Sequence, residues 1–177
     1  KKMQITIDVP IPCSAELFID EMLKQLKSSP INNNKFSKWS KQCLEWKERF
    51  PVILPKYWDY TDGVSIYSLV DALSESMKVG DLFHPGSSGA CSEVSMQAFK
   101  VRNGVRVFNS EGMGAMGFGI SGAIGGCLAA GKKRTFCIDG DGGFSMNTQE
   151  LETIRRLNLP IVFFVLDNHG YGSIRAT

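Results

Sequence analysis

One continuous stretch decides the fold: TFCIDGDGGFSMNTQELETIRRLNLPIVFFVLDNHGYG, which runs from residue 135 to residue 172. Residues 135–140 and 161–168 are short and largely apolar, as expected of buried strands, while residues 148–158 carry apolar side chains at helical spacing. A strand, a helix and a second strand of these lengths are typical of a crossover between parallel strands. The stretch therefore predicts an α/β fold with a parallel sheet.

Two polar side chains follow these strands, 27 residues apart: Asp141 and Asn168. The carboxyl ends of neighbouring parallel strands meet at one edge of a sheet, so the two residues should become spatial neighbours. A carboxylate and an amide oxygen are ligands that Mg²⁺ prefers, and the turn after Asn168 can add a backbone carbonyl, most simply that of Gly170. The sequence therefore predicts a magnesium site.

Glycines surround Asp141 at positions 140, 142 and 143. Without a Cβ they let the backbone turn tightly and approach an anion closely. We expect a helix to follow directly, with Asn147 as its N-cap and Glu150 three residues later. The positive end of this helix would face the same anion.

The same alternation of elements extends upstream. We expect helices over residues 64–77, 93–100 and 117–131 and strands over 81–86 and 105–110. Helices on both faces should cover the parallel sheet. Two further glycine-rich segments, HPGSSGA and SEGMGAMG, follow strands and should lie at the same edge.

The first fifty residues form a separate region. Residues 4–10 alternate apolar and polar side chains like a strand, and residues 15–27 and 38–50 have helical periodicity. The Pro-containing, non-periodic residues 51–62 are interpreted as a linker between domains.

Composition argues against several classes of partner. Net charge is only +2 and the basic residues form no long run, so neither nucleic acid nor an anionic membrane is indicated, and a small charged metabolite fits better. We expect a cytoplasmic protein, because the sequence shows neither a long apolar segment nor a secretory signal. Five cysteines without CxxC spacing are read as reduced thiols. The two histidines lie far from any cysteine pair, so a metal site must use oxygen ligands.

The segment GDG, followed at this spacing by DN and then by GYG, resembles the diphosphate and metal motif of thiamine-diphosphate-dependent enzymes, particularly the acetolactate synthase and pyruvate decarboxylase group. The resemblance implies that Asp141, Asn168 and the Gly170 carbonyl bind Mg²⁺. It departs from the family at Asp167, where Asn is frequent, and at Gly143, where Ser is frequent. Neither departure removes a matching metal ligand.

The resemblance also implies a set of residues that bind thiamine diphosphate. The GMGAMG segment would hold the aminopyrimidine ring through the Gly114 carbonyl and the Met116 backbone, with the Met116 side chain under the thiazolium. Ser87 would contact the diphosphate. The remaining residues of the set are Gly86, Ser88, Gly140, Gly142, Gly143, Tyr171 and Gly172.

As the resemblance implies, this chain is a fragment of a three-domain enzyme. Residues 1–50 would be the C-terminal part of the central domain, and residues 63–177 the diphosphate- and magnesium-binding domain, truncated at its C-terminus. The activating glutamate would come from a separate domain of a partner subunit, in a homodimer or homotetramer whose active site lies at the subunit interface. We therefore expect the fragment alone to be inactive. FAD binding to the central domain is left open.

The implied activity is that of an acetolactate synthase-like transferase or lyase, which decarboxylates a 2-oxo acid and transfers the acyl-anion equivalent to a second carbonyl. Three alternatives remain: a simple 2-oxo acid decarboxylase, a cofactor-binding module without catalysis, and an NAD-binding Rossmann domain. The last rests on GMGAMG, which fits G-x-G-x-x-G after a strand, with Asp139 22 residues after its last glycine.

Overall fold

The computed structural model describes residues 7–110 and 112–175. The chain divides into two compact units, Lys1–Phe50 and Pro51–Thr177. No helix in these described ranges is long and apolar enough to cross a membrane.

The first unit contains α1 (Ala15–Ser28), the 3-10 helix η1 (Asn33–Phe36) and α2 (Ser37–Arg49). The Ser14 hydroxyl caps α1 by accepting a hydrogen bond from the Leu17 backbone N–H at 3.3 Å. Every residue of α1 and α2 is described and none of them is buried. Both expected helices are confirmed.

The strand expected over residues 4–10 is wrong for its described part. Residues 7–10 form no strand, and residues 4–6 lie outside the described residues. Alternation predicts a strand only where one set of side chains can be buried against a core, and here both Ile7 and Val9 are exposed.

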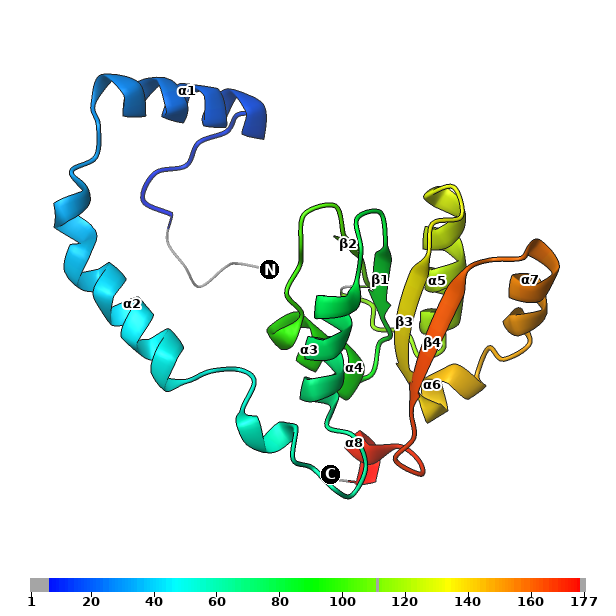
Figure 1. Ribbon diagram of the computed structural model, residues 1–177. Coiled ribbons are helices and arrows are strands. Elements are labelled where there is room, and N and C mark those ends of the chain that lie inside the picture. The colour runs from blue at the N-terminus through cyan, green and yellow to red at the C-terminus, as the bar shows by residue number, and fades with distance from the viewer. Residues whose placement is uncertain (1–6, 111, 176–177) are drawn as a thin grey trace. The chain divides into compact units, whose positions relative to one another are not determined.

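The second unit is built around a four-stranded parallel sheet in the order β2-β1-β3-β4 (Figure 1). Its elements in chain order are η2 (Pro55–Tyr57), α3 (Ile66–Ser76), β1 (Leu82–Pro85), α4 (Gly89–Ala98), β2 (Arg106–Val107), α5 (Phe118–Ala129), β3 (Thr135–Gly140), α6 (Asp141–Ser145), α7 (Glu150–Leu157), β4 (Ile161–Leu166) and α8 (Gly172–Arg175). The parallel α/β architecture agrees with the sequence prediction. Strand β2 is shorter than expected, and α6 was not expected as a helix separate from α7.

Helices cover both faces of this sheet, which confirms the expected layering. On one face, α3 and α4 pack on Phe83 of β1 and Ile138 of β3. On the other face, α5 contributes Ile120 and Ile124 to a second core, which Ile154 of α7 joins. Successive strand residues alternate between the two layers, as the pleat requires.

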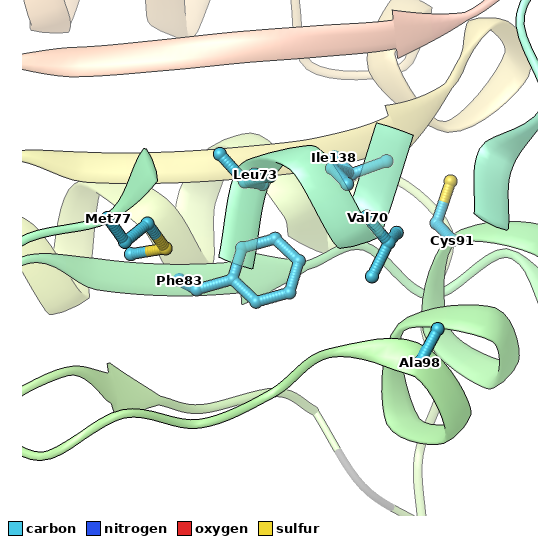
Figure 2. Packing of buried hydrophobic residues seen from close by; sticks show 7 residues of the cluster. All are labelled: Val70, Leu73, Met77, Phe83, Cys91, Ala98 and Ile138. Atoms are coloured by element: carbon cyan, nitrogen blue, oxygen red, sulfur yellow. The ribbon is translucent and has the colours of Figure 1, made fainter. Parts of the chain in front are cut away.

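The larger core gathers around Phe83, as Figure 2 shows. Phe83 is fully buried and its ring stacks on Phe99 with centroids 4.5 Å apart. The other buried members of this cluster are Val70, Leu73, Met77, Cys91, Ala98 and Ile138. Ile53 packs against the same cluster, and Tyr57 stacks on Tyr67 of α3. Part of the 51–62 segment therefore packs onto the rest of the second unit.

We expect Phe83→Ala to lower the free energy of unfolding by about 3–5 kcal/mol, because it removes a buried aromatic ring and leaves a cavity in this core. Urea denaturation followed by circular dichroism measures the change. Val101→Ala is the matched control, since Val101 is 63% exposed and its truncation should change stability by less than about 0.5 kcal/mol. Equal effects of the two substitutions would contradict the assignment of the core.

Stability should also depend on the protonation of His84 of β1, which is fully buried. Burial lowers the pKa of His84 below its ordinary value of 6.5, although the carbonyls of Phe108 and Phe118 oppose the shift. The unfolded chain therefore takes up this proton at a higher pH than the folded chain does, so stability should fall as the pH drops from about 7.5 to 5.5. Urea midpoints across this range test the expectation, and His84→Asn should give a flatter profile than the wild type.

Candidate functional site

A cavity of about 270 Å³ opens at the carboxyl ends of β1, β3 and β4. Four segments form its walls: the loop after β1 that leads into α4, the loop before α5, the turn from β3 into α6, and the turn from β4 into α8. Eleven of the residues named from the sequence line it, namely Ser87, Ser88, Met116, Gly140, Asp141, Gly142, Gly143, Asn168, Gly170, Tyr171 and Gly172. The parallel pairing of β3 with β4 places the β3 and β4 turns side by side, since Gly140 is in register with Leu166.

The carboxylate of Asp141 joins the turns after β3 and β4. Its Oδ1 accepts from the backbone N–H of Gly142 at 2.9 Å, and its Oδ2 accepts from the backbone N–H of Gly170 at 2.9 Å. Gly170 has a φ of +130°, a backbone conformation that side chains rarely allow. Asp141 thus lies against the turn that follows β4, as the spacing predicted.

The turn from Asn168 to Gly172 packs closely on the β3 turn. A Cβ on Gly142 would lie 2.4 Å from Cε1 of Tyr171, so only glycine admits the ring here. The Asn168 carbonyl accepts from the Arg175 guanidinium at 2.8 Å, which ties α8 back to the turn. Asn168 therefore sits in a constrained loop and lines the cavity together with Asp141.

The loop that contains GMGAMG reaches the cavity through Met116, which is 47% exposed. The Ser87 hydroxyl donates to the Ala115 carbonyl at 2.8 Å, and the Asn147 side chain donates to the Gly117 carbonyl at 2.8 Å. These bonds hold the loop from the β1 side and from the segment after α6. Asn147 therefore does not cap α7, whose N-cap is Gln149, and the expected capping box is wrong.

Gly86, Gly114 and Ser88 differ in placement from the rest of the predicted set. Gly86 does not line the cavity but donates its N–H to the Ile138 carbonyl at 2.6 Å, extending the pairing of β1 with β3. Gly114 also lies off the cavity lining and has a φ of +56°. Ser88 lines the cavity but uses its hydroxyl to accept from the Cys91 N–H as the N-cap of α4.

Asp139 is a site residue that sequence reasoning considered only for a dinucleotide site. It lines the cavity, is 1% exposed, and its Oδ2 has no hydrogen-bond partner among the residues described. Burial raises its pKa, against the hydrogen bond that Oδ1 accepts from the Gly140 N–H. Cβ atoms on Gly86, Gly119 and Gly143 would lie within 2.1–2.7 Å of its carboxylate oxygens, so three glycines enclose it. Two of these glycines, Gly86 and Gly119, lie far from Asp139 in the sequence, so no local pattern indicates the enclosure.

The charges of the cavity are all negative. Asp139 and Asp141 are the ionisable acids among the described lining residues, and none of those residues is a lysine or an arginine. The described part of the chain also holds no group of three or more His, Cys, Asp and Glu side chains placed to bind a metal. A cation at this site would therefore combine a single carboxylate such as Asp141 with amide and backbone oxygens.

Residues 87–177 match the family described as "Thiamine pyrophosphate enzyme, C-terminal TPP binding domain". The chain belongs to this family. The matched residues include every cavity-lining residue described above, and thiamine pyrophosphate is the same compound as thiamine diphosphate.

Curated relatives narrow the group within the thiamine pyrophosphate enzymes. The chain is 33% identical to a probable acetolactate synthase large subunit of Methanococcus aeolicus, with 96% of this chain and 30% of that protein aligned. It is 27% identical to the acetolactate synthase isozyme 3 large subunit of Escherichia coli (strain K12), with 97% of this chain and 29% of that protein aligned. The chain thus spans about a third of the length of these relatives, and it is related to the acetolactate synthase group.

The sheet of this chain differs from that of a dinucleotide-binding Rossmann fold in one topological respect. The strand before GMGAMG is β2, which is two residues long and lies at the edge of the sheet. In a Rossmann fold the strand that leads into the glycine-rich turn lies inside the sheet, beside the topological switch point. The order β2-β1-β3-β4 therefore argues against the NAD-binding alternative.

Two glycines of α5 give a matched test of the Asp139 enclosure. A Cβ at Gly119 would lie 2.1 Å from Oδ2 of Asp139, whereas a Cβ at Gly125 meets nothing within 4 Å. We expect Gly119→Ala to lower the free energy of unfolding by about 2 kcal/mol or more through overpacking. Gly125→Ala should raise it by about 0.5–1 kcal/mol, because alanine favours the helix. Denaturant titration measures both, and a Gly119→Ala protein as stable as wild type would contradict the enclosure.

Proposed function

We propose that this chain forms the thiamine-diphosphate- and Mg²⁺-binding part of an acetolactate synthase-like enzyme. The whole enzyme would decarboxylate a 2-oxo acid and transfer the resulting acyl-anion equivalent to a second carbonyl. The observation that carries the proposal is the cavity in which Asp141 is fastened to the turn after β4. Family membership and the acetolactate synthase relatives support the assignment.

The residues present fit a magnesium ion and a diphosphate. The cavity walls carry carboxylates and no basic side chain among the lining residues described, so an anionic diphosphate needs a bound cation to offset the repulsion. Asp141, the Asn168 side chain and the Gly170 carbonyl are the oxygen donors we assign to Mg²⁺. Gly140, Gly142 and Gly143 leave room for the diphosphate against the backbone, with Ser87, Ser88, Tyr171 and Gly172 around it.

Thiamine diphosphate, when bound, supplies the carbanion chemistry that a protein side chain lacks. The tasks left to this chain are to position and desolvate it. Met116 is the residue we assign to the ring system, since it is the large apolar side chain that the glycine-rich loop presents to the cavity. Gly114 would contribute its carbonyl to the aminopyrimidine, and Gly86 would support the β1 loop from behind.

Several parts of the proposal concern the whole enzyme. The activating glutamate would come from a separate domain of a partner subunit, so the enzyme would be a homodimer or homotetramer with its active site at the interface. Residues 1–50 would belong to a central domain, and FAD binding there stays undetermined. The enzyme would work in the cytoplasm on a small 2-oxo acid, without nucleic acid or membrane as a partner.

Two other functions make different predictions. A simple 2-oxo acid decarboxylase would release acetaldehyde from pyruvate, whereas an acetolactate synthase-like enzyme would form acetolactate. A cofactor-binding module without catalysis would bind thiamine diphosphate and form neither product. Product analysis of the full-length protein with pyruvate therefore separates all three.

The binding site itself is tested by calorimetric titration with thiamine diphosphate, with and without Mg²⁺. We expect binding to require Mg²⁺ and to weaken by at least about 100-fold in Asp141→Ala, because a charged metal ligand is lost. Asp167→Asn is the matched control: it removes a neighbouring charge whose carboxylate accepts from the His169 N–H and lies 3.2 Å from His169 Nδ1, so binding should be retained. Mg²⁺-independent binding, or equal losses in the two variants, would overturn the proposed site.

A further inference from the structure

His84 of β1 occupies an unusual position, between the two ends of the glycine-rich loop. The loop spans residues 109–117, of which the structure describes all but residue 111, and it is bracketed by Phe108 and Phe118. The His84 ring stacks on Phe108 with centroids 4.6 Å apart and meets Phe118 edge-on at 5.7 Å. One buried side chain therefore contacts both residues that anchor the loop.

A hydrogen bond fixes the orientation of this ring. His84 Nδ1 lies 2.8 Å from the Phe108 carbonyl oxygen, which only accepts, so Nδ1 carries the proton and donates it. Nε2 is buried and makes no hydrogen bond to the residues that the structure describes. The hydrogen bond from Nδ1 to the Phe108 carbonyl therefore orients the ring, and the Phe118 carbonyl also lies close enough to raise the pKa of His84.

Helix α5 is shaped around the same assembly. A Cβ on Gly122 would lie 2.3 Å from His84 Nε2, and a Cβ on Gly126 would lie 2.1 Å from Cζ of Phe108. The two glycines thus let the His84–Phe108 stack press against the helix that begins where the loop ends. The residues after His84 continue this contact, because the Ser87 hydroxyl donates to the Ala115 carbonyl inside the loop.

We propose that His84 is a positioning residue that braces both ends of the 109–117 loop and so holds Met116 at the cavity wall. The brace itself does not depend on the proposed function. Only its expected effect on cofactor binding rests on the proposed thiamine diphosphate site. His84 touches neither Asp141 nor the turn after β4 through any hydrogen bond or ring contact of the described residues. The brace should therefore affect the ring end of the cofactor and leave the diphosphate end unchanged.

Two substitutions separate the Nδ1 donor from simple loss of the ring. Asn places its amide N–H close to the position of Nδ1, whereas Gln places it near Nε2, away from the Phe108 carbonyl that Nδ1 reaches. Val70→Ala serves as a stability control, since Val70 is fully buried in the core on the opposite face of the sheet. It should destabilise the protein without selectively loosening the loop.

Hydrogen exchange tests the brace in the absence of any ligand. The amides of Met113 and Gly114 donate to the Ser110 carbonyl, and that of Phe118 donates to the Ala115 carbonyl. We expect these three amides to exchange about tenfold faster in His84→Gln and within about twofold of wild type in His84→Asn. Equal rates in His84→Gln and Val70→Ala, or equal effects of Gln and Asn, would overturn the proposal.

Ligand titration tests the effect of the brace on cofactor binding. In the presence of Mg²⁺, His84→Gln should weaken the binding of thiamine diphosphate by about tenfold, because a smaller fraction of molecules holds the loop in the binding-competent conformation. Inorganic pyrophosphate, which lacks the rings, should bind within about twofold of wild type. Equal weakening of both ligands, or a wild type that binds pyrophosphate but not thiamine diphosphate, would refute the role of the loop. A wild type that binds neither would refute the proposed function, while the exchange rates would still decide whether His84 is a brace.

Discussion

The site depends on the hydrogen bonds of one carboxylate, that of Asp141, to the backbone N–H groups of Gly142 and Gly170. The pairing of β3 with β4 ends at Gly140 and Leu166, so beyond this point no ladder holds the two turns together. Asp141 connects the two turns instead, because each of its carboxylate oxygens accepts a hydrogen bond from a different turn. The relative position of the walls of the cavity is thus set by a side chain that is itself part of the cavity lining.

This arrangement makes the cavity unfavourable for an anion that enters alone. Phosphate sites that work without a metal use lysine, arginine or the N-terminal N–H groups of a helix. Here the N–H of Gly142 in α6 already donates to Asp141, and burial raises the pKa of the neighbouring Asp139. Asp141 and Asn168 both line the cavity, which holds no basic side chain among its described residues. Under the proposed function, a diphosphate would therefore enter together with a divalent cation that offsets the repulsion.

Local pattern was enough for much of the second unit. The apolar runs predicted β3 and β4, and helical periodicity predicted α3 and α7. The spacing between Asp141 and Asn168 predicted that the turns after β3 and β4 meet, because parallel strand ends share an edge. The strand predicted from alternating apolar and polar residues is not formed at residues 7–10, because no core lies there to bury their apolar side chains. Local pattern also misassigned Asn147, which uses its amide on Gly117, 30 residues away, instead of capping α7. Contacts of that kind depend on the packing of distant segments and leave no periodic trace in the sequence.

The glycines of α5 show how far such packing reaches. Gly119, Gly122 and Gly126 lie at i, i+3 and i+7 and so share one face of the helix. Each glycine in a helix interior costs about 1 kcal/mol relative to alanine. On this face each one admits a different buried group: Asp139 at the cavity, His84 of β1, and Phe108 at the start of the loop. A stripe that reads in sequence as small core residues is therefore a surface complementary to three particular side chains. Asp139 lines the cavity, while His84 and Phe108 flank the loop that presents Met116. Helix α5 therefore packs against both the β3 side of the site and this loop.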